Sequence, residues 1–240
     1  DAARGAPTGG AFSGAGLGLD ATTGATLRVV AGDLTCPSGL SVDPIGGDLF
    51  FVDQCFGGGT DNPSLFRLTD PSGTDPGRPT EVVVYATLPG SPNGVVAFSP
   101  DGTMYVAGSY TLPQPPVLRV SGTNAPQPAS VVVLPNVSAL YWVNVGEVLP
   151  DGTAKSLIVL SPLAPNPLQL VDITTPVPTV TPLTLAGISS GTIGPDGCLY
   201  TGSSDAVYKI SPSDGACRFS ATNPAPALAL SPPSVSPNPP

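Results

Sequence analysis

The stretch SPNGVVAFSPDGTMYV, residues 91–106, consists of an apolar run, a Pro-Asp-Gly corner and a second apolar run. Proline presets one turn dihedral and glycine adopts a positive φ, so the corner predicts a tight turn between two antiparallel strands. The pattern recurs at intervals of roughly 45 to 55 residues, a spacing typical of repeat folds. Its other copies are SGLSVDPIGGDLFFVD (38–53), VNVGEVLPDGTAKSLIVL (143–160) and SGTIGPDGCLYTGS (190–203).

Each copy is followed by a second pair of short apolar runs. The pairs are SLFRLTD with EVVVYATLPG, PVLRVSG with SVVVLPNVS, PLQLVDITT with TVTPLTLAG, and AVYKISP with ACRFSAT. Four antiparallel strands per repeat at this period are typical of the blades of a β-propeller, in which small sheets stack face to face around an axis. We therefore predict an all-β protein with the β-propeller architecture.

The two ends of the chain resemble parts of one further blade. Residues 10–32 match the last three strands of a blade, and residues 226–237 resemble a first strand. Joining them would complete a blade and protect two sheet edges from pairing with other chains. We therefore predict five four-stranded blades, one closed by the N- and C-terminal strands, in a single domain over residues 10–237. Six blades are the alternative. Residues 1–9 would be an N-terminal extension, and residues 238–240 a Pro-rich end or the start of a linker.

Composition narrows the classes of function. The 32 prolines and 29 glycines recur too often for a long helix. The net charge is −9, and the eight basic residues are scattered singly, so we expect no surface that could neutralise the phosphates of a nucleic acid. No stretch approaches ~18 consecutive apolar residues, so we also expect no membrane span.

The four cysteines predict a disulfide framework. Cys36 and Cys55 flank one predicted hairpin, and Cys198 and Cys217 flank another. Of the three possible connectivities we favour these two local pairings, which close loops of about 19 residues. Disulfides persist in oxidising compartments, so we expect a secreted or extracellular protein, the periplasm and the cell surface included. Four reduced, buried cysteines are the alternative.

The runs at 91–108 and 37–53 resemble the secreted propeller superfamily that includes NHL-repeat proteins, streptogramin-lyase-like proteins and the gluconolactonase family. The shared motif is a packing motif, so the resemblance implies the fold more specifically than any activity. A streptogramin-lyase-like reaction uses a histidine for proton transfer, and this chain has no histidine. That activity is therefore not expected here.

A gluconolactonase-like activity would imply a divalent cation held by oxygen ligands near the central channel. The resemblance places Asn93 at one ligand position, and Asn144 lies at nearly the same place in the next blade, followed by Glu147. Carbonyl and carboxylate oxygens suit Ca²⁺, so these three residues are the candidate metal ligands. The alternative is that the two asparagines cap strand ends by bonding backbone groups.

A recurring set of aspartates lies in the turns of the repeats, namely Asp43, Asp101, Asp151 and Asp196. A carboxylate at such a turn position typically accepts hydrogen bonds from its own backbone. We therefore interpret these four residues as turn formers.

Two main classes of function remain. We favour a non-enzymatic propeller that serves as a protein interaction module or a subunit of an extracellular assembly, with other proteins or copies of itself as partners. Its low charge fits the charge-depleted cores of protein interfaces. The alternatives are a metal-dependent lactonase-like hydrolase at the channel, and a carbohydrate-binding propeller that stacks sugars on rings such as Trp142. We assign no catalytic residue and expect no cofactor, with Ca²⁺ as the alternative.

Overall fold

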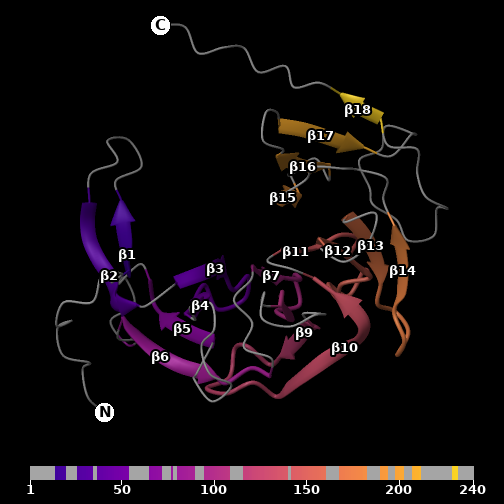
Figure 1. Cartoon of the computed structure of the whole chain (residues 1–240). Helices are drawn as coiled ribbons and strands as arrows, with labels where there is room; N and C mark the ends of the chain where they lie inside the picture. Colours follow the sequence, from indigo (N-terminus) through magenta and orange to yellow (C-terminus); the bar gives the residue numbers. More distant parts are fainter. Residues whose placement is uncertain are drawn as a thin grey trace, which may run out of the picture.

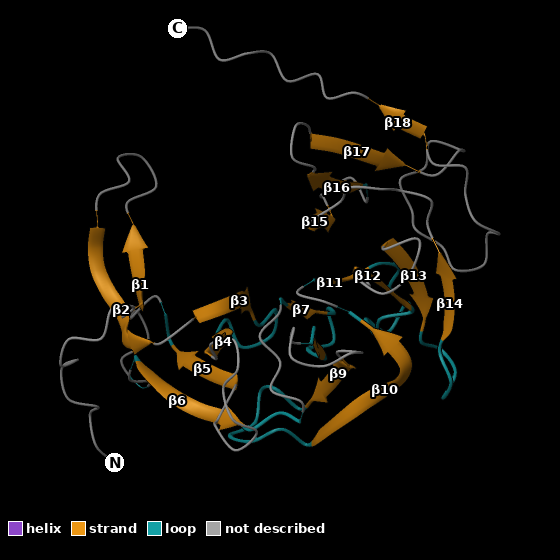
Figure 2. Ribbon diagram, in the orientation of Figure 1, coloured by secondary structure: helices purple, strands orange, loops and turns teal. Residues whose placement is uncertain are grey.

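A computed structural model describes eighteen strands of this protein and several of the turns between them. The described residues are 14–19, 26–34, 37–53, 65–71, 77, 80–89, 95–108, 116–139, 142–160, 168–182, 190–193, 198–202, 207–211 and 229–231. Every described element is a β-strand (Figure 2). This part of the chain contains no helix that is long and apolar enough to cross a bilayer.

Four sheets of the described chain contain four strands each, joined in sequence order as antiparallel meanders. The first sheet consists of β3 (Pro37–Val42), β4 (Leu49–Asp53), β5 (Leu65–Thr69) and β6 (Glu81–Ala86). The second consists of β7 (Val96–Phe98), β8 (Met104–Val106), β9 (Pro116–Ser121) and β10 (Ser130–Ser138). The third consists of β11 (Val143–Val145), β12 (Ser156–Leu160), β13 (Leu168–Asp172) and β14 (Thr179–Pro182). The fourth consists of β15 (Ser190–Ile193), β16 (Leu199–Gly202), β17 (Val207–Ser211) and β18 (Ala229–Ser231).

The sheets follow one another along an arc (Figure 1). The first strand of each sheet contacts the first strand of the next, so β3, β7, β11 and β15 lie on the inner side, while β6, β10 and β14 lie on the outer side. A separate hairpin of β1 (Gly14–Leu19) and β2 (Thr26–Leu34) lies beside β6. The predicted all-β class and the four-stranded antiparallel repeats are therefore present.

The central strands are covered on both faces, so their side chains alternate between two cores. On β4, Phe50 packs in the core shared with the second sheet, whereas Phe51 lies in a separate cluster. On β12, Leu157 belongs to the core between the second and third sheets, and Ile158 to the core shared with the fourth. Because successive side chains of a strand point to opposite faces, a strand buried on both sides requires a continuous apolar run. The sequences LFFV and SLIVL have that form.

The chain ends do not meet as we predicted. The C-terminal strand β18 pairs with β17, at the outer edge of the fourth sheet, and the described ladder of β1 is with β2 alone. The β1–β2 hairpin and β18 lie at opposite ends of the arc (Figure 1). A short uncharged strand does not select one sheet edge over another, and the edge of β17 is near in sequence, so pairing there closes a much shorter loop. The prediction of a blade shared by both termini is therefore wrong, and the number of blades stays a prediction.

The turns of successive sheets contact one another at one end of the molecule. Gly47, Gly102 and Gly152 all have positive φ, at 71°, 83° and 89°. The backbone N–H of Asp101 donates to the carbonyl oxygen of Gly152 at 3.2 Å, which joins the turn of the second sheet to that of the third. A Cβ on Gly102 would lie 2.7 Å from Cδ1 of Ile45 in the turn of the first sheet. Glycine at this corner therefore permits both the turn and the close approach of neighbouring sheets.

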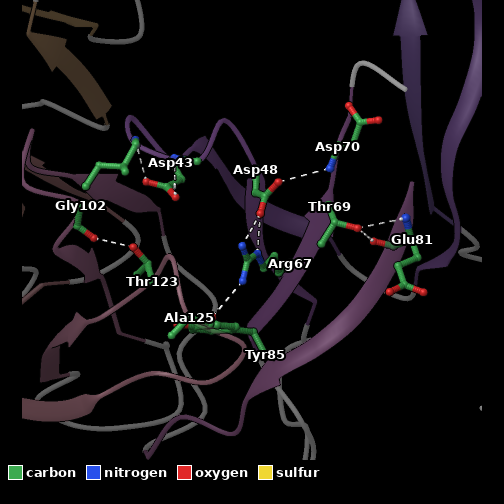
Figure 3. A network of polar contacts seen from close by, with 12 residues as sticks. Asp43, Asp48, Arg67, Thr69, Asp70, Glu81, Tyr85, Gly102, Thr123 and Ala125 are labelled. Atoms are coloured by element: carbon green, nitrogen blue, oxygen red, sulfur yellow. Dashed lines mark hydrogen bonds and ion pairs between the residues drawn. The ribbon is translucent and has the colours of Figure 1, made fainter. Parts of the chain in front are cut away.

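A buried ion pair within the first sheet is hydrogen-bonded to the second sheet through its arginine (Figure 3). Arg67 on β5 donates from Nε to Oδ2 of Asp48 at 2.6 Å, and from Nη1 to the carbonyl oxygen of Ala125 in the β9–β10 turn at 2.9 Å. Asp48 is fully buried and Arg67 is 8% exposed. Nearby, Tyr85 on β6 donates its hydroxyl to the carbonyl oxygen of Gly122 at 3.1 Å, and burial raises the pKa of Tyr85 to about 12. These polar links lie at the edge of the apolar core and hold the two sheets in register.

Candidate functional site

A cavity of about 590 Å³ lies where the inner strands of the four sheets meet. Its described wall comes from β3, β7 and β11 with the residues next to them, and from Gly191 on β15. These strands are neighbours in space and occupy the inner side of the arc (Figure 1). This is the position of the central channel in a propeller, where ligand sites are commonly built.

The wall of this channel cavity is largely apolar. Leu40 and Val42, two residues apart on β3, are 64% and 54% exposed, which is unusual for large aliphatic side chains. The polar side chains among the described wall residues are Ser41, Ser99 and Asn144, and none of these carries a charge. The described wall is therefore suited to uncharged, apolar groups.

Asn144 is the one predicted site residue that the structure places on the cavity wall. Its Oδ1 accepts a hydrogen bond from the backbone N–H of Val145 at 3.1 Å. The next residue, Gly146, donates its N–H to the carbonyl oxygen of Ser156 on the neighbouring strand, so strand alternation points the N–H of Val145 the other way, toward the channel. Asn144 thus caps its own strand, as the alternative interpretation predicted. Because Oδ1 takes this bond, the amide orientation is set and Nδ2 is directed away from Val145.

Glu147 is placed differently from Asn144. Its Oε2 accepts from Nζ of Lys155 at 2.9 Å, its backbone N–H donates to Oγ of Ser156 at 2.9 Å, and it is not among the described residues that line the cavity. Asn93 lies outside the described residues. Across the described part of the chain, no group of three or more His, Cys, Asp or Glu side chains is placed to hold a metal ion. The Ca²⁺ site at Asn93, Asn144 and Glu147 stays a prediction.

The turn aspartates have the role that the sequence predicted. Asp101 accepts from the backbone N–H of Thr103 at 3.1 Å and from its hydroxyl at 2.8 Å. Asp151 makes the same pair of contacts with the threonine two residues later, and the hydroxyl hydrogen bond holds the pKa of Asp151 below its usual value. Asp43 accepts from the backbone N–H groups two and three residues ahead. The prediction is confirmed for these three residues, and Asp196 lies outside the described residues.

The structure describes one of the four cysteines, Cys198. Cys198 is fully buried and forms a disulfide bond. Cys36, Cys55 and Cys217 lie outside the described residues, so the two predicted pairings stay predictions.

Trp142 closes the cavity between the third and fourth sheets. Its side chain is 3% exposed, and its Nε1–H donates to the carbonyl oxygen of Gly191. A Cβ on Gly191 would come within 2.7 Å of the carbonyl oxygen of Tyr200 on β16 and 3.2 Å of Cζ2 of Trp142, so a glycine is needed where β15 approaches both. A ring buried in this way offers little surface for stacking a sugar.

Sequence reasoning missed the aliphatic residues of the cavity wall. The sequence pattern places Leu40 and Val42 in a predicted strand and does not by itself assign them a role at the channel. The signal was available, because the first run of each repeat forms the strand nearest the axis of a propeller. An apolar side chain that projects from this strand is therefore a candidate to line the channel.

A second exposed apolar feature lies on the outer strands of the first two sheets. Val84 on β6 is 52% exposed, and Val133 on β10 is 47% exposed; Val82 and Val132 are exposed at 36% and 38%. Both strands stand at the end of their sheets in the described topology. An outer strand with exposed valines has the side chains that favour β pairing.

Comparison with known proteins supports the fold. No family model matches the chain, and no curated protein sequence matches it. Among solved structures, virginiamycin B lyase from Staphylococcus aureus aligns with a TM-score of 0.50 and 14% sequence identity, over 85% of this chain and 57% of the lyase. This chain therefore spans little more than half the length of that protein.

Two further solved structures align less closely. The major allergen Mala s 1 from Malassezia sympodialis aligns with a TM-score of 0.45 and 18% identity, over 91% of this chain and 68% of the allergen. The calcium-binding protein regucalcin from Agrobacterium tumefaciens aligns with a TM-score of 0.35 and 15% identity, over 78% of this chain and 74% of that protein. All of these neighbours belong to the β-propeller superfamily. At such identities the likeness concerns the fold alone, and the predicted β-propeller class is confirmed.

Proposed function

We propose that this propeller is a non-enzymatic protein interaction module, and that it associates with other chains, including copies of itself, through its outer strands. The observation that carries the proposal is the exposure of Val84 and Val133 on the outermost strands of two successive sheets. Edge strands present backbone N–H and C=O groups that template pairing with another chain. Exposed β-branched side chains on such strands add apolar area to that pairing.

The contrast with the third sheet strengthens this interpretation. Its outer strand, β14, is four residues long and ends in Pro182, which are common ways of protecting an edge. By comparison, β6 contains the run Val82–Val84, and the first four residues of β10, Ser130–Val133, include three valines and no charge. Glu81 at the start of β6 and Pro135 in β10 lie outside these stretches, so the segments Val82–Val84 and Ser130–Val133 themselves lack the proline that ends β14.

The proposed location is extracellular. The disulfide bond at Cys198 supports it, because protein disulfides persist mainly in oxidising compartments. The chain also has only 10% charged residues, which fits a surface that is covered by partners. Lactone hydrolysis and sugar binding stay predictions from the sequence.

Multi-angle light scattering coupled to size exclusion tests the proposal. The wild-type protein is expected to form oligomers whose population rises with concentration. The double variant Val84→Lys with Val133→Lys should shift the protein to monomers, since charged edge residues oppose strand pairing. Val177→Lys is the matched control, because Val177 is 60% exposed in the β13–β14 loop, away from both outer strands. A wild-type monomer at all concentrations, or equal masses for wild type and the double variant, would contradict self-association through these strands.

A further inference from the structure

We infer that the channel cavity is a binding site for an uncharged, largely apolar small molecule that carries a hydrogen-bond acceptor, such as a carbonyl oxygen, facing Asn144. This site is separate from the outer strands and does not depend on the proposed association between chains.

The size and the lining of the cavity indicate the class of ligand. Small-molecule sites are typically concave, about 300–1,000 Å³ in volume, mainly apolar, and supplied with a few polar groups that orient the ligand. The channel cavity has a volume of about 590 Å³ and is lined by aliphatic, aromatic and proline side chains with three uncharged polar ones. It therefore fits this class by volume and by chemistry.

The uncharged wall and the negative net charge of the protein both disfavour an ionic ligand in the channel cavity. The described wall offers no cationic group to an anion and no carboxylate to a cation. The protein also has a net charge of −9, which repels anions at a distance. Transfer of a charged group into an apolar cavity without a partner is costly, so an uncharged molecule is favoured.

Asn144 provides the polar contact. The bond from the N–H of Val145 to Oδ1 fixes the orientation of the amide, so the hydrogen-bond donor that Asn144 offers to the cavity is its Nδ2 group. Of the two serines of the wall, Ser41 lies on β3, away from β11, and the hydroxyl of Ser99 lies 2.5 Å from Oδ1 of Asp101 and 3.1 Å from the carbonyl oxygen of Thr103, within its own turn. A ligand acceptor near the β11 wall would therefore be bound by Asn144.

The experiment compares a matched pair of fluorescent probes. The first is 6-propionyl-2-(dimethylamino)naphthalene, which is uncharged and carries one carbonyl, and whose emission shifts to the blue in an apolar site. The second is 2-(dimethylamino)naphthalene, which lacks the carbonyl. We expect the ketone to bind with an affinity about threefold to tenfold higher than the parent compound, as one net hydrogen bond implies. The anionic probe 1-anilinonaphthalene-8-sulfonate should bind more weakly than the ketone.

Two variants locate the binding and a third serves as control. Asn144→Asp retains an oxygen for the N–H of Val145 but replaces the donor by an anionic oxygen, and should remove the preference for the ketone. Leu40→Asp changes an exposed wall residue and should weaken both uncharged probes. Asn124→Asp makes the same chemical change at an exposed position in the β9–β10 turn and should bind like the wild type.

The inference is overturned by any of three results. These are no binding of the ketone, equal affinity of the two uncharged probes for the wild type, and unchanged ketone binding by Asn144→Asp or Leu40→Asp. Light scattering on the same variants distinguishes this test from that of self-association. Neither Leu40 nor Asn144 lies on an outer strand, so their variants should have the same mass in solution as the wild type.

Discussion

Replacement of Arg67 by methionine should destabilise the protein by about 3–5 kcal/mol. Methionine preserves much of the apolar stem but removes the guanidinium from Asp48, whose side chain water does not reach. The change also removes the hydrogen bond to the carbonyl oxygen of Ala125, a contribution of about 1 kcal/mol. The larger part of the expected loss comes from the buried carboxylate, which keeps the hydrogen bond from the backbone N–H of Asp70 but loses its cation.

A double-mutant cycle isolates the ion pair from these other contributions. Asp48→Asn should cost a similar amount, because it leaves the buried guanidinium without its anion. The variant with both changes should be at least ~2 kcal/mol more stable than the sum of the single losses predicts. Unfolding in denaturant, followed by the fluorescence of Trp142, measures all three free energies, since Trp142 is the only tryptophan and is buried.

A second ion pair, whose side chains are less buried than those of Arg67 and Asp48, provides the control. Nζ of Lys155 lies 2.9 Å from Oε2 of Glu147, and the two side chains are 16% and 32% exposed. Lys155→Met should therefore lower the free energy of unfolding by less than ~1 kcal/mol. The reasoning is refuted if Arg67→Met costs no more than Lys155→Met, or if the losses at Arg67 and Asp48 are additive.

Three further predictions concern the turns, the tyrosines and the core. Gly122→Ala should lower the free energy of unfolding more than Gly47→Ala does. Both residues have positive φ, but only at Gly122 would the new Cβ lie 2.7 Å from Cβ of Ala129. We expect a loss of ~1 kcal/mol for Gly47→Ala and at least twice that for Gly122→Ala, measured by unfolding in denaturant. Burial raises the pKa of Tyr105 to about 12 from 10.0, so between these values the unfolded chain releases a proton that the folded chain retains. Stability should therefore fall as pH rises from about 10 to 12, by up to ~1.4 kcal/mol per pKa unit, and Tyr105→Phe should lose that part of the pH dependence in unfolding curves at pH 9 and 11. Leu157→Ala, at a fully buried position, should cost about 2–5 kcal/mol, and a loss below ~1 kcal/mol would mean that this core is not closely packed.

The repeated motif made much of the fold predictable. The Pro-Asp-Gly corner sets a turn by local stereochemistry, and a continuous apolar run such as SLIVL requires cover on both faces. These are properties of residues close together in the chain, so the sequence alone determined the antiparallel meanders, the turn role of Asp101 and Asp151, and the stacking of sheets.

Only the tertiary structure decided which distant groups meet. The position of β18 depended on a choice among several sheet edges with similar local chemistry, and loop closure favoured β17 over the N-terminal hairpin. The channel also depends on tertiary packing. Asn144 lies on its wall, whereas Glu147, three residues later, forms an ion pair with Lys155. Local sequence determines strands and turns because their energies depend on near neighbours, whereas the site depends on how separate sheets pack, and that is set by the summed contacts of the whole core.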